Sequence, residues 1–225
     1  MKPVTAYWED QYVKNESLWG LQPDYRLVQY GRLAPPGKVL DLGAGEGRNV
    51  LWLAAFGGYE AEGVELSAAA IERCRANGER YGVPVCMHQA DLRTFPVQEE
   101  AYSCIIAANS LNFMAKSELL QLLPRLKAGV KPGGLLYLSL FSQLDPKYAV
   151  FKETLEPCGE DTFYLESLQG PVCFPHRREI GEWFEDFETL CFSEALEWDN
   201  GHGEPHYHGI AEYIGRKKGN EEEKR

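Results

Sequence analysis

The stretch "VLDLGAGEGRNVLWLA", residues 39–54, contains the pattern that decides the fold. It begins as a short apolar strand that includes Asp41. Three glycines then stand at alternate positions, Gly43, Gly45 and Gly47, and a run with apolar residues at helical spacing follows them. Glycine lets the backbone adopt positive φ angles and approach a ligand closely at a helix N-terminus. Because a packing turn needs only one glycine, the three together predict a binding site for a nucleotide-type cofactor.

Composition and charge set limits on the class of protein. The chain has 225 residues, 44% of them hydrophobic and 25% charged, which suits one globular α/β domain. Its formal net charge of −11 repels phosphate backbones, so we expect no nucleic-acid partner. No stretch approaches the roughly 20 apolar residues that cross a bilayer, and the start lacks a secretory signal. We therefore expect a cytoplasmic protein, monomeric or homodimeric, with no membrane partner and with its six cysteines reduced.

Strands and helices alternate after residue 32. The expected strands cover residues 38–43, 61–66, 83–91, 101–109 and 133–141, and the expected helices cover 48–58, 68–82 and 118–130. We expect Pro124 to kink or divide the last helix. Two final strands, joined by an Asn-Gly turn, end the pattern. The fold class is therefore predicted to be α/β, with a doubly wound, mostly parallel seven-stranded sheet and a C-terminal antiparallel hairpin.

The chain is predicted to form one domain over residues 1–218, with 219–225 as a disordered tail. Residues 142–175 contain four prolines and show no periodic pattern. A long segment of this kind inside a compact domain is commonly a functional loop, so we predict an irregular, lid-like insertion that is mobile without ligand. A further helix is expected over residues 178–187.

The charges around the glycines select among nucleotide-type cofactors. Nicotinamide-binding folds use G-x-G-x-x-G, and Arg48 stands here where that motif has its last glycine. Glu46 lies at the helix start, where a pyrophosphate would bind, and Asp41 adds a second negative charge. The site is thus predicted to take a ligand that carries positive charge. S-adenosyl-L-methionine (SAM) meets this demand with its sulfonium and ammonium groups, and a nicotinamide-dependent dehydrogenase is the alternative.

These motifs resemble those of a known superfamily. "VLDLGAGEGRN", the acidic strand end "VEL" and the later "QADL" resemble the class I SAM-dependent methyltransferases, over nearly the whole chain. "GRN", "CFPHRREI" and the histidine-bearing final hairpin are similar to the tellurite-resistance and thiopurine-type branch. The resemblance implies a Rossmann-like methyltransferase fold and methyl transfer from SAM to a small molecule. The branch implies a soft sulfur, selenium or tellurium acceptor.

The resemblance also implies cofactor contacts at the ends of the strands. Asp41 would hold the amino group of SAM, Glu65 the ribose hydroxyls and Asp91 the adenine amino group, while residues 1–32 would cover the cofactor. The complete set of implied cofactor residues is Trp19, Asp41, Gly43, Ala44, Gly45, Arg48, Asn49, Glu65, Leu66, Asp91, Leu92 and Asn109. An Asx turn after the strand is the alternative for Asp91, and a surface position on the first helical turn is the alternative for Arg48.

Asn112, Phe113, Arg178 and His206 are the candidates for contact with the methyl acceptor. A packing role is the alternative for Phe113, and capping of the helix "RREI" is the alternative for the segment around Arg178. A soft anion needs no general base, whereas a hydroxyl or ammonium acceptor does, and His206 is then the best placed base. We assign no catalytic residue on this basis. An O- or N-methyltransferase and a SAM-binding protein without turnover are the alternative functions.

Four potential metal ligands stand close together near the C-terminus: His202, Glu204, His206 and His208. On a strand, the last two would share one face and could converge. No third His or Cys stands at a zinc-like spacing, and methyl transfer needs no metal. We therefore expect no metal site.

Overall fold

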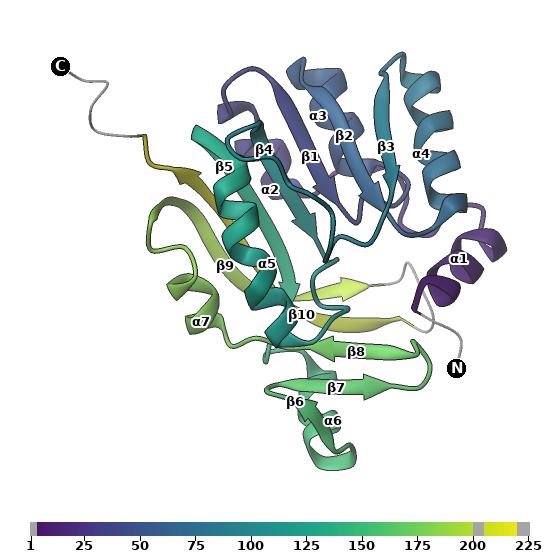
Figure 1. Cartoon of the computed structure of the whole chain (residues 1–225). Coiled ribbons are helices and arrows are strands. Elements are labelled where there is room, and N and C mark those ends of the chain that lie inside the picture. Colours follow the sequence, from purple (N-terminus) through teal and green to yellow (C-terminus); the bar gives the residue numbers. More distant parts are fainter. Residues whose placement is uncertain (1–3, 200–204, 220–225) are drawn as a thin grey trace.

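The computed structural model describes residues 4–199 and 205–219, and a seven-stranded sheet forms their centre (Figure 1). Its strands are β1 (Lys38–Leu42), β2 (Glu60–Glu65), β3 (Val85–Gln89), β4 (Tyr102–Ala108), β5 (Val130–Phe141), β9 (Phe187–Asp199) and β10 (His206–Lys217). The order across the sheet is β3-β2-β1-β4-β5-β10-β9. The first five strands are parallel, and β10 runs antiparallel to both of its neighbours. The predicted fold class is confirmed.

Helices cover both faces of the sheet (Figure 1). One face carries α2 (Tyr25–Tyr30), α3 (Arg48–Gly57) and α4 (Ala68–Tyr81), and the other carries α5 (Lys116–Gly129) and α7 (Arg177–Glu182). Side chains alternate along a strand, so Val39 packs under the first group of helices and Leu40 and Leu42 under the second. The apolar run of β1 is thus buried on both sides, as parallel strands require. The helix α1 (Val4–Lys14) and the short η1 (Gly31–Leu33) belong to the N-terminal segment.

Pro124 does not divide α5, one of the two effects expected of it. The helix runs without a break from Lys116 to Gly129 with the proline inside it. Proline removes the N–H that would bond to the carbonyl of Leu120, and both residues are exposed. Water can therefore satisfy the carbonyl that the proline leaves free.

The expectation that residues 142–175 are irregular is wrong. They form α6 (Pro146–Thr154) and a three-stranded antiparallel sheet of β6 (Pro157–Gly159), β7 (Thr162–Leu165) and β8 (Gly170–Cys173). Asp145 accepts a hydrogen bond from the N–H of Lys147 at 2.8 Å, and Pro146 begins the helix, where its missing N–H costs nothing. Phe163, Val172 and Phe174 are the buried centre of a separate apolar cluster. This insertion lies beyond the carboxyl ends of the parallel strands (Figure 1).

Other predicted segments differ in extent. The helix expected over residues 178–187 ends at Glu182, because the chain turns there toward the start of β9 at Phe187. The β9–β10 pair is present, but its Asn-Gly turn lies outside the described residues, as does the predicted tail beyond Gly219.

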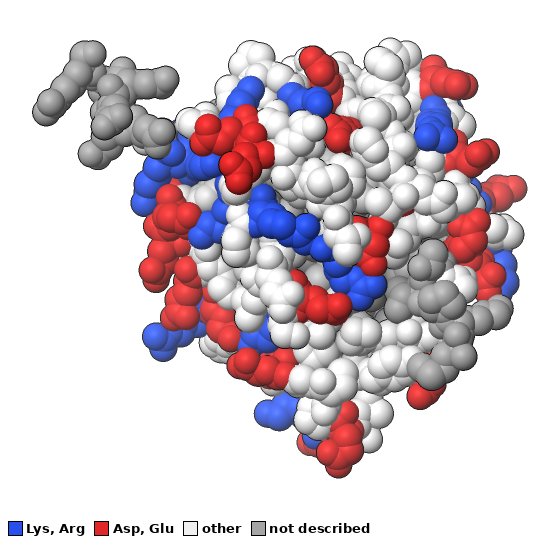
Figure 2. All heavy atoms as spheres, in the orientation of Figure 1, with Lys and Arg blue, Asp and Glu red and all other residues white. Residues whose placement is uncertain are grey.

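Charged side chains of both signs are spread over the face shown in Figure 2, where acidic and basic side chains are interspersed. Within the described part of the chain, no helix is long and apolar enough to span a membrane.

Asn112, a predicted acceptor residue, joins the main sheet to the insertion. Its Nδ2 donates to the carbonyls of Phe141 (3.2 Å) and Cys173 (2.8 Å), and its Oδ1 accepts from the N–H of Phe141 (2.9 Å). The side chain is fully buried. The side-chain amide of Asn112 thus forms its hydrogen bonds with the backbone at the ends of β5 and β8. These contacts indicate a structural role and not contact with the acceptor.

We predict that Asn112→Ala lowers the free energy of unfolding by about 2–3 kcal/mol, because buried backbone groups of β5 and β8 lose their partner. Urea denaturation of both proteins measures the difference. Asn15→Ala, at the exposed end of α1, is the matched control and should change stability by less than about 0.5 kcal/mol. Equal effects of the two substitutions would contradict the structural role.

Candidate functional site

A cavity of about 1610 Å³ lies at the carboxyl ends of the parallel strands, between the N-terminal segment and the insertion. All twelve predicted cofactor residues line it, as do Phe113 and His206. Topology explains this, because parallel strands bring their carboxyl ends to one edge of the sheet. Asn112 and Arg178 are the predicted site residues that do not line it.

The glycine turn between β1 and α3 has the backbone that three glycines predict. Gly43, Gly45 and Gly47 have φ angles of 78°, 53° and 90°, in the left-handed region that side chains disfavour. A Cβ on Gly43 would lie 2.5 Å from the Cβ of Ser110, and one on Gly45 would lie 2.7 Å from the Tyr12 hydroxyl. The turn thus needs glycine both for its φ angles and for its close contacts.

Glu65 ends β2 and connects it to the glycine turn. Its Oε2 accepts from the N–H of Gly45 at 3.0 Å, and its Oε1 accepts from the N–H groups of Leu66 (2.7 Å) and Ser67 (3.0 Å). Burial raises the pKa of Glu65, although these hydrogen bonds favour the ionised form. Its carboxylate oxygens retain further acceptor capacity toward the cavity.

Asp91 follows β3, and its carboxylate is already engaged. Oδ1 accepts from the backbone N–H of Arg93 at 2.9 Å, and the guanidinium of the same residue binds both carboxylate oxygens at 2.6–3.0 Å. Burial raises the pKa of Asp91, but the bonds from Arg93 outweigh it and hold the pKa below its usual value. The turn expected as the alternative for this residue is therefore present, on the wall of the cavity.

Asp41 is buried at the end of β1. Burial, together with the nearby charge of Asp24, raises the pKa of Asp41 to about 7. Arg48 binds Asp24 Oδ1 at 2.9 Å, and Asn49 binds Asp24 through both its amide atoms, at 2.9 and 3.1 Å. Arg48 and Asn49 thus hold the N-terminal segment against α3. Arg48 begins this helix and also lines the cavity.

Glu46 lines the cavity, but its carboxylate binds protein partners. It is buried and accepts from the Ser17 hydroxyl (3.0 Å) and the N–H of Leu18 (3.2 Å), and it pairs with Arg73 (3.0 Å). Its charge is neutralised by these partners. Glu46 therefore gives no reason to exclude a pyrophosphate ligand, whereas the buried Asp41 still does.

An aromatic wall runs along the cavity from the N-terminal segment to β10. Trp8 packs edge-on against Phe113 with ring centres 4.9 Å apart, Phe113 lies 6.0 Å from Phe141, and Phe141 stacks on His208 at 4.6 Å. Trp8 also packs against the predicted cofactor residue Trp19, at 6.5 Å. Phe113 thus has the packing role given above as its alternative, and it also lines the cavity.

The end of β4 carries a strained residue beside the cavity. Asn109 has a φ angle of 51°, and its Oδ1 accepts from the Ser139 hydroxyl at 2.7 Å. Left-handed backbone in a residue other than glycine persists where surrounding contacts enforce it, which is common at binding sites.

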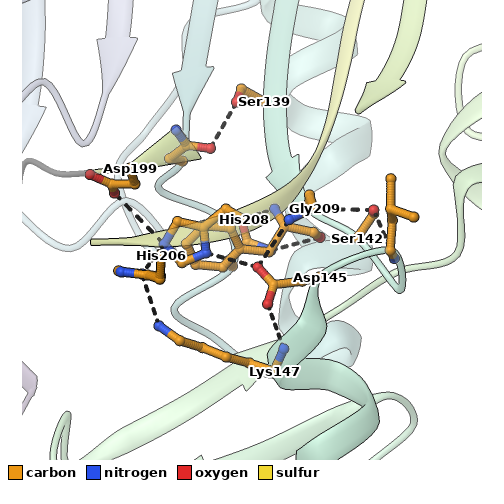
Figure 3. Close-up of polar contacts among 12 residues, drawn as sticks. Ser139, Ser142, Asp145, Lys147, Asp199, His206, His208 and Gly209 are labelled. Atoms are coloured by element: carbon orange, nitrogen blue, oxygen red, sulfur yellow. Dashed lines mark hydrogen bonds and ion pairs between the residues drawn. The ribbon is translucent and has the colours of Figure 1, made fainter. Parts of the chain in front are cut away.

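A polar cluster from β9, β10 and the start of α6 occupies the other end of the cavity (Figure 3). His208 Nδ1 lies 2.8 Å from Oδ2 of Asp145, which is buried. His208 Nε2 lies 2.9 Å from His206 Nε2 and 3.7 Å from Asp199 Oδ2. Lys147 Nζ lies 3.2 Å from His206 Nε2. This arrangement can receive a proton or bind a cation.

Sequence reasoning missed Asp145 and Asp199 as site residues. The Asp-Pro pair at 145–146 is a helix-start signal that could have placed the first of them. Asp199 is the cross-strand partner of His206, a register that the sequence does not fix.

Arg178 lies outside the cavity. Its side chain is 81% exposed and pairs with Glu182 at 2.7 Å, while its N–H donates to His176 Nδ1 at 3.2 Å. The predicted acceptor contact is therefore not supported, and the capping alternative is confirmed.

Comparisons with known proteins agree with this geometry. Residues 39–134 match a family described as a methyltransferase domain. Carboxy-S-adenosyl-L-methionine synthase of Aliivibrio fischeri is 34% identical over 110 residues, 47% of this chain and 45% of that protein. TehB from Haemophilus influenzae superposes with a TM-score of 0.68 at 20% identity, over 94% of this chain and 67% of TehB. A SAM-dependent methyltransferase from Methanosarcina mazei gives 0.71 at 16% identity, over 89% and 100%.

The chain spans about half the length of the curated relatives it matches, and the solved structures, at 20% identity or less, show the fold alone. The domain match nevertheless covers the glycine turn and the strand ends that line the cavity. Residues 39–134 thus match a methyltransferase domain, and the chain shares its overall fold with solved SAM-dependent methyltransferases.

Proposed function

We propose that this protein transfers the methyl group of SAM to a small-molecule acceptor inside the cavity. One observation supports this above all: the predicted cofactor residues line one cavity of about 1610 Å³. Single-ligand pockets commonly measure about 300–1,000 Å³, so this cavity has room for the cofactor and a second small molecule. In this proposal the N-terminal segment covers the cofactor and the insertion covers the acceptor.

The residues that line the cavity match the parts of SAM. Ionised Asp41 would attract the ammonium and sulfonium groups, Glu65 would accept from the ribose hydroxyls, and Asp91 would accept from the adenine amino group. The nucleophile's electron pair forms the new bond to the methyl carbon, while the carbon–sulfur bond breaks and its electrons stay on sulfur. Catalysis then comes mainly from alignment of the two reactants, which supplies about 7–11 kcal/mol in favourable cases.

The charge of the cavity bears on the acceptor. Among the described lining residues, nine are Asp or Glu and three are Lys or Arg, and Arg178 lies elsewhere. This balance disfavours the soft anionic acceptor that the branch resemblance implies and favours a neutral or cationic one. We therefore propose O- or N-methylation. The acceptor's proton would leave toward the His206–His208 pair, since Asp145 holds the Nδ1–H of His208 and leaves Nε2 to accept.

We predict that SAM binds with a Kd in the micromolar range and that NAD does not bind. Glu65→Gln and Asp91→Asn should each weaken SAM binding roughly tenfold to hundredfold, because each loses charge-assisted hydrogen bonds worth about 1.5–3 kcal/mol. Titration calorimetry measures both. Glu60→Gln, at the exposed start of β2, is the control and should bind SAM like the original chain. Tight binding of NAD without binding of SAM would overturn the cofactor assignment.

The raised pKa of Asp41 predicts a pH dependence of cofactor binding. With a pKa of about 7, Asp41 is mostly protonated at pH 6 without ligand, and a cationic ligand must first displace that proton. SAM affinity should therefore rise about tenfold from pH 6 to pH 8. Asp41→Asn should abolish this dependence, and an unchanged slope would show that another group is responsible.

The raised pKa of Asp41 also predicts how the stability of the ligand-free chain depends on pH. Between about pH 4 and pH 7 the folded state holds a proton on Asp41 that the unfolded chain has lost, so stability falls as pH rises through this range. Denaturation at several pH values, with Asp41→Asn for comparison, measures the effect.

A panel of small thiols, phenols and amines tests the class of acceptor. Methyl transfer is measured as the formation of S-adenosylhomocysteine, the product that SAM leaves. We predict turnover with hydroxyl or amine compounds, and a maximal rate at least 100-fold lower in His206→Gln with SAM affinity unchanged. His176→Gln, outside the cavity, is the matched control. Turnover of thiols alone, within tenfold of the original rate in His206→Gln, would support the soft acceptor instead. Binding of SAM with no turnover of any acceptor would support a SAM-binding protein.

A further inference from the structure

We propose that Asp199, His206 and His208 bind one divalent transition-metal ion at the acceptor end of the cavity. A metal site is not expected from the sequence, in which no third His or Cys stands at a suitable spacing. The fold supplies the third ligand as a carboxylate from the neighbouring strand. Two imidazoles and one carboxylate suit ions such as Zn²⁺, Fe²⁺, Co²⁺ and Ni²⁺.

The hairpin of β9 and β10 brings the three ligands together. His206 and Asp199 are directly paired across the strands, and His208 stands two residues along on the same face as His206. One ligand atom from each residue lies within 4.8 Å of the other two. The separations of His208 Nε2 from His206 Nε2 and Asp199 Oδ2 are 2.9 and 3.7 Å. Ligands at 2.0–2.1 Å from a tetrahedral zinc ion are about 3.3 Å apart, so small side-chain shifts would complete the site.

Asp145 orients the imidazole of His208 through a hydrogen bond, as carboxylates commonly do for metal-bound histidines. Its Oδ2 accepts from His208 Nδ1 at 2.8 Å and from the N–H of Gly209 at 3.2 Å, and its Oδ1 is fixed by the N–H of Lys147 (Figure 3). With the proton on Nδ1, the lone pair of His208 is on Nε2, the atom that faces His206 and Asp199. The ring is also held by stacking on Phe141, and its side chain is only 8% exposed. The tautomer and the orientation are thus set for metal binding.

Lys147 shows that a positive charge is already accommodated next to the cluster, because its Nζ lies 3.2 Å from His206 Nε2. The Nε2 atoms of His206 and His208 are 2.9 Å apart and share a hydrogen bond. An ion bound between them and Asp199 would replace that hydrogen bond. Lys147 is exposed and can swing away when the ion binds.

Three protein ligands leave a tetrahedral ion one open position. Because all three residues line the cavity, that position would face the acceptor space and hold an oxygen or nitrogen atom there. With the ion bound, His206 and His208 are ligands and cannot also take the acceptor's proton, so the ion would replace them in promoting loss of that proton, which would leave to water. This last role rests on the proposed methyl transfer, whereas the metal site itself does not.

Zinc titration calorimetry tests the site, on the full chain treated with chelator and without SAM. We predict binding of one Zn²⁺ per chain, at least tenfold weaker in His206→Ala and in His208→Ala. Asp145→Asn should weaken it tenfold to 100-fold, the usual effect of losing a carboxylate that orients a metal-bound histidine. His206 is only partly buried, so its variant is the one expected to keep the original unfolding curve.

The matched control is His88→Ala. His88 is on β3, and its Nε2 lies 3.0 Å from Glu62 Oε1 on β2 and 3.6 Å from the Cys86 thiol, so it offers metal-ligating groups away from the proposed site. Zinc binding should be unchanged in this variant. No binding to the original chain, equal binding in folded His206→Ala, or binding lost only in His88→Ala would each overturn the proposal. SAM titration separates the two hypotheses, since failure of the metal site leaves SAM binding intact and failure of the cofactor assignment leaves zinc binding intact.

Discussion

The buried carboxylate of Glu65 holds the candidate site together. Its hydrogen bonds from Gly45, Leu66 and Ser67 connect the end of β2, the glycine turn and the start of α4. A buried carboxylate without such partners would cost several kcal/mol, so the glycine turn is held in the geometry that satisfies it. Ser67, fixed in this way, caps α4 by accepting from the N–H of Ala70. Two strands and two helices therefore meet at one side chain, on the wall of the cavity.

The central sheet could be predicted from the sequence because its signals are local. Apolar runs, the glycines after β1 and the Asn-Gly turn each report on a few neighbouring residues, and they identified all strands of the main sheet. The elements of the insertion were not predicted because β6, β7 and β8 have only three or four residues each, and two of them contain a proline. Prolines such as Pro146 suggested an irregular segment, but Pro146 follows the N-cap residue Asp145 and begins a helix.

The residues of the candidate site also differ in how far the sequence predicts them. Asp41, Glu65 and Asp91 follow strands, so the topology alone brings them to one edge. The pairing of Asp199 with His206, and of Asp145 with His208, depends on hairpin register and on the fold of the insertion. The ion pairs of the glycine turn could not be predicted, because their partners are remote in sequence: Glu46 was expected to oppose a bound phosphate, yet it binds Ser17 and Leu18, and Arg48 binds Asp24. Tertiary ion pairs of this kind leave no periodic signal.

Asp145 divides its two oxygens between two tasks. Oδ1 caps the first turn of α6, and Oδ2 holds His208. Because one carboxylate serves both, any displacement of Asp145 that follows a movement of the His208 ring would also remove a helix cap worth about 1 kcal/mol. The insertion that this helix opens is therefore coupled to the wall of the cavity through a single side chain.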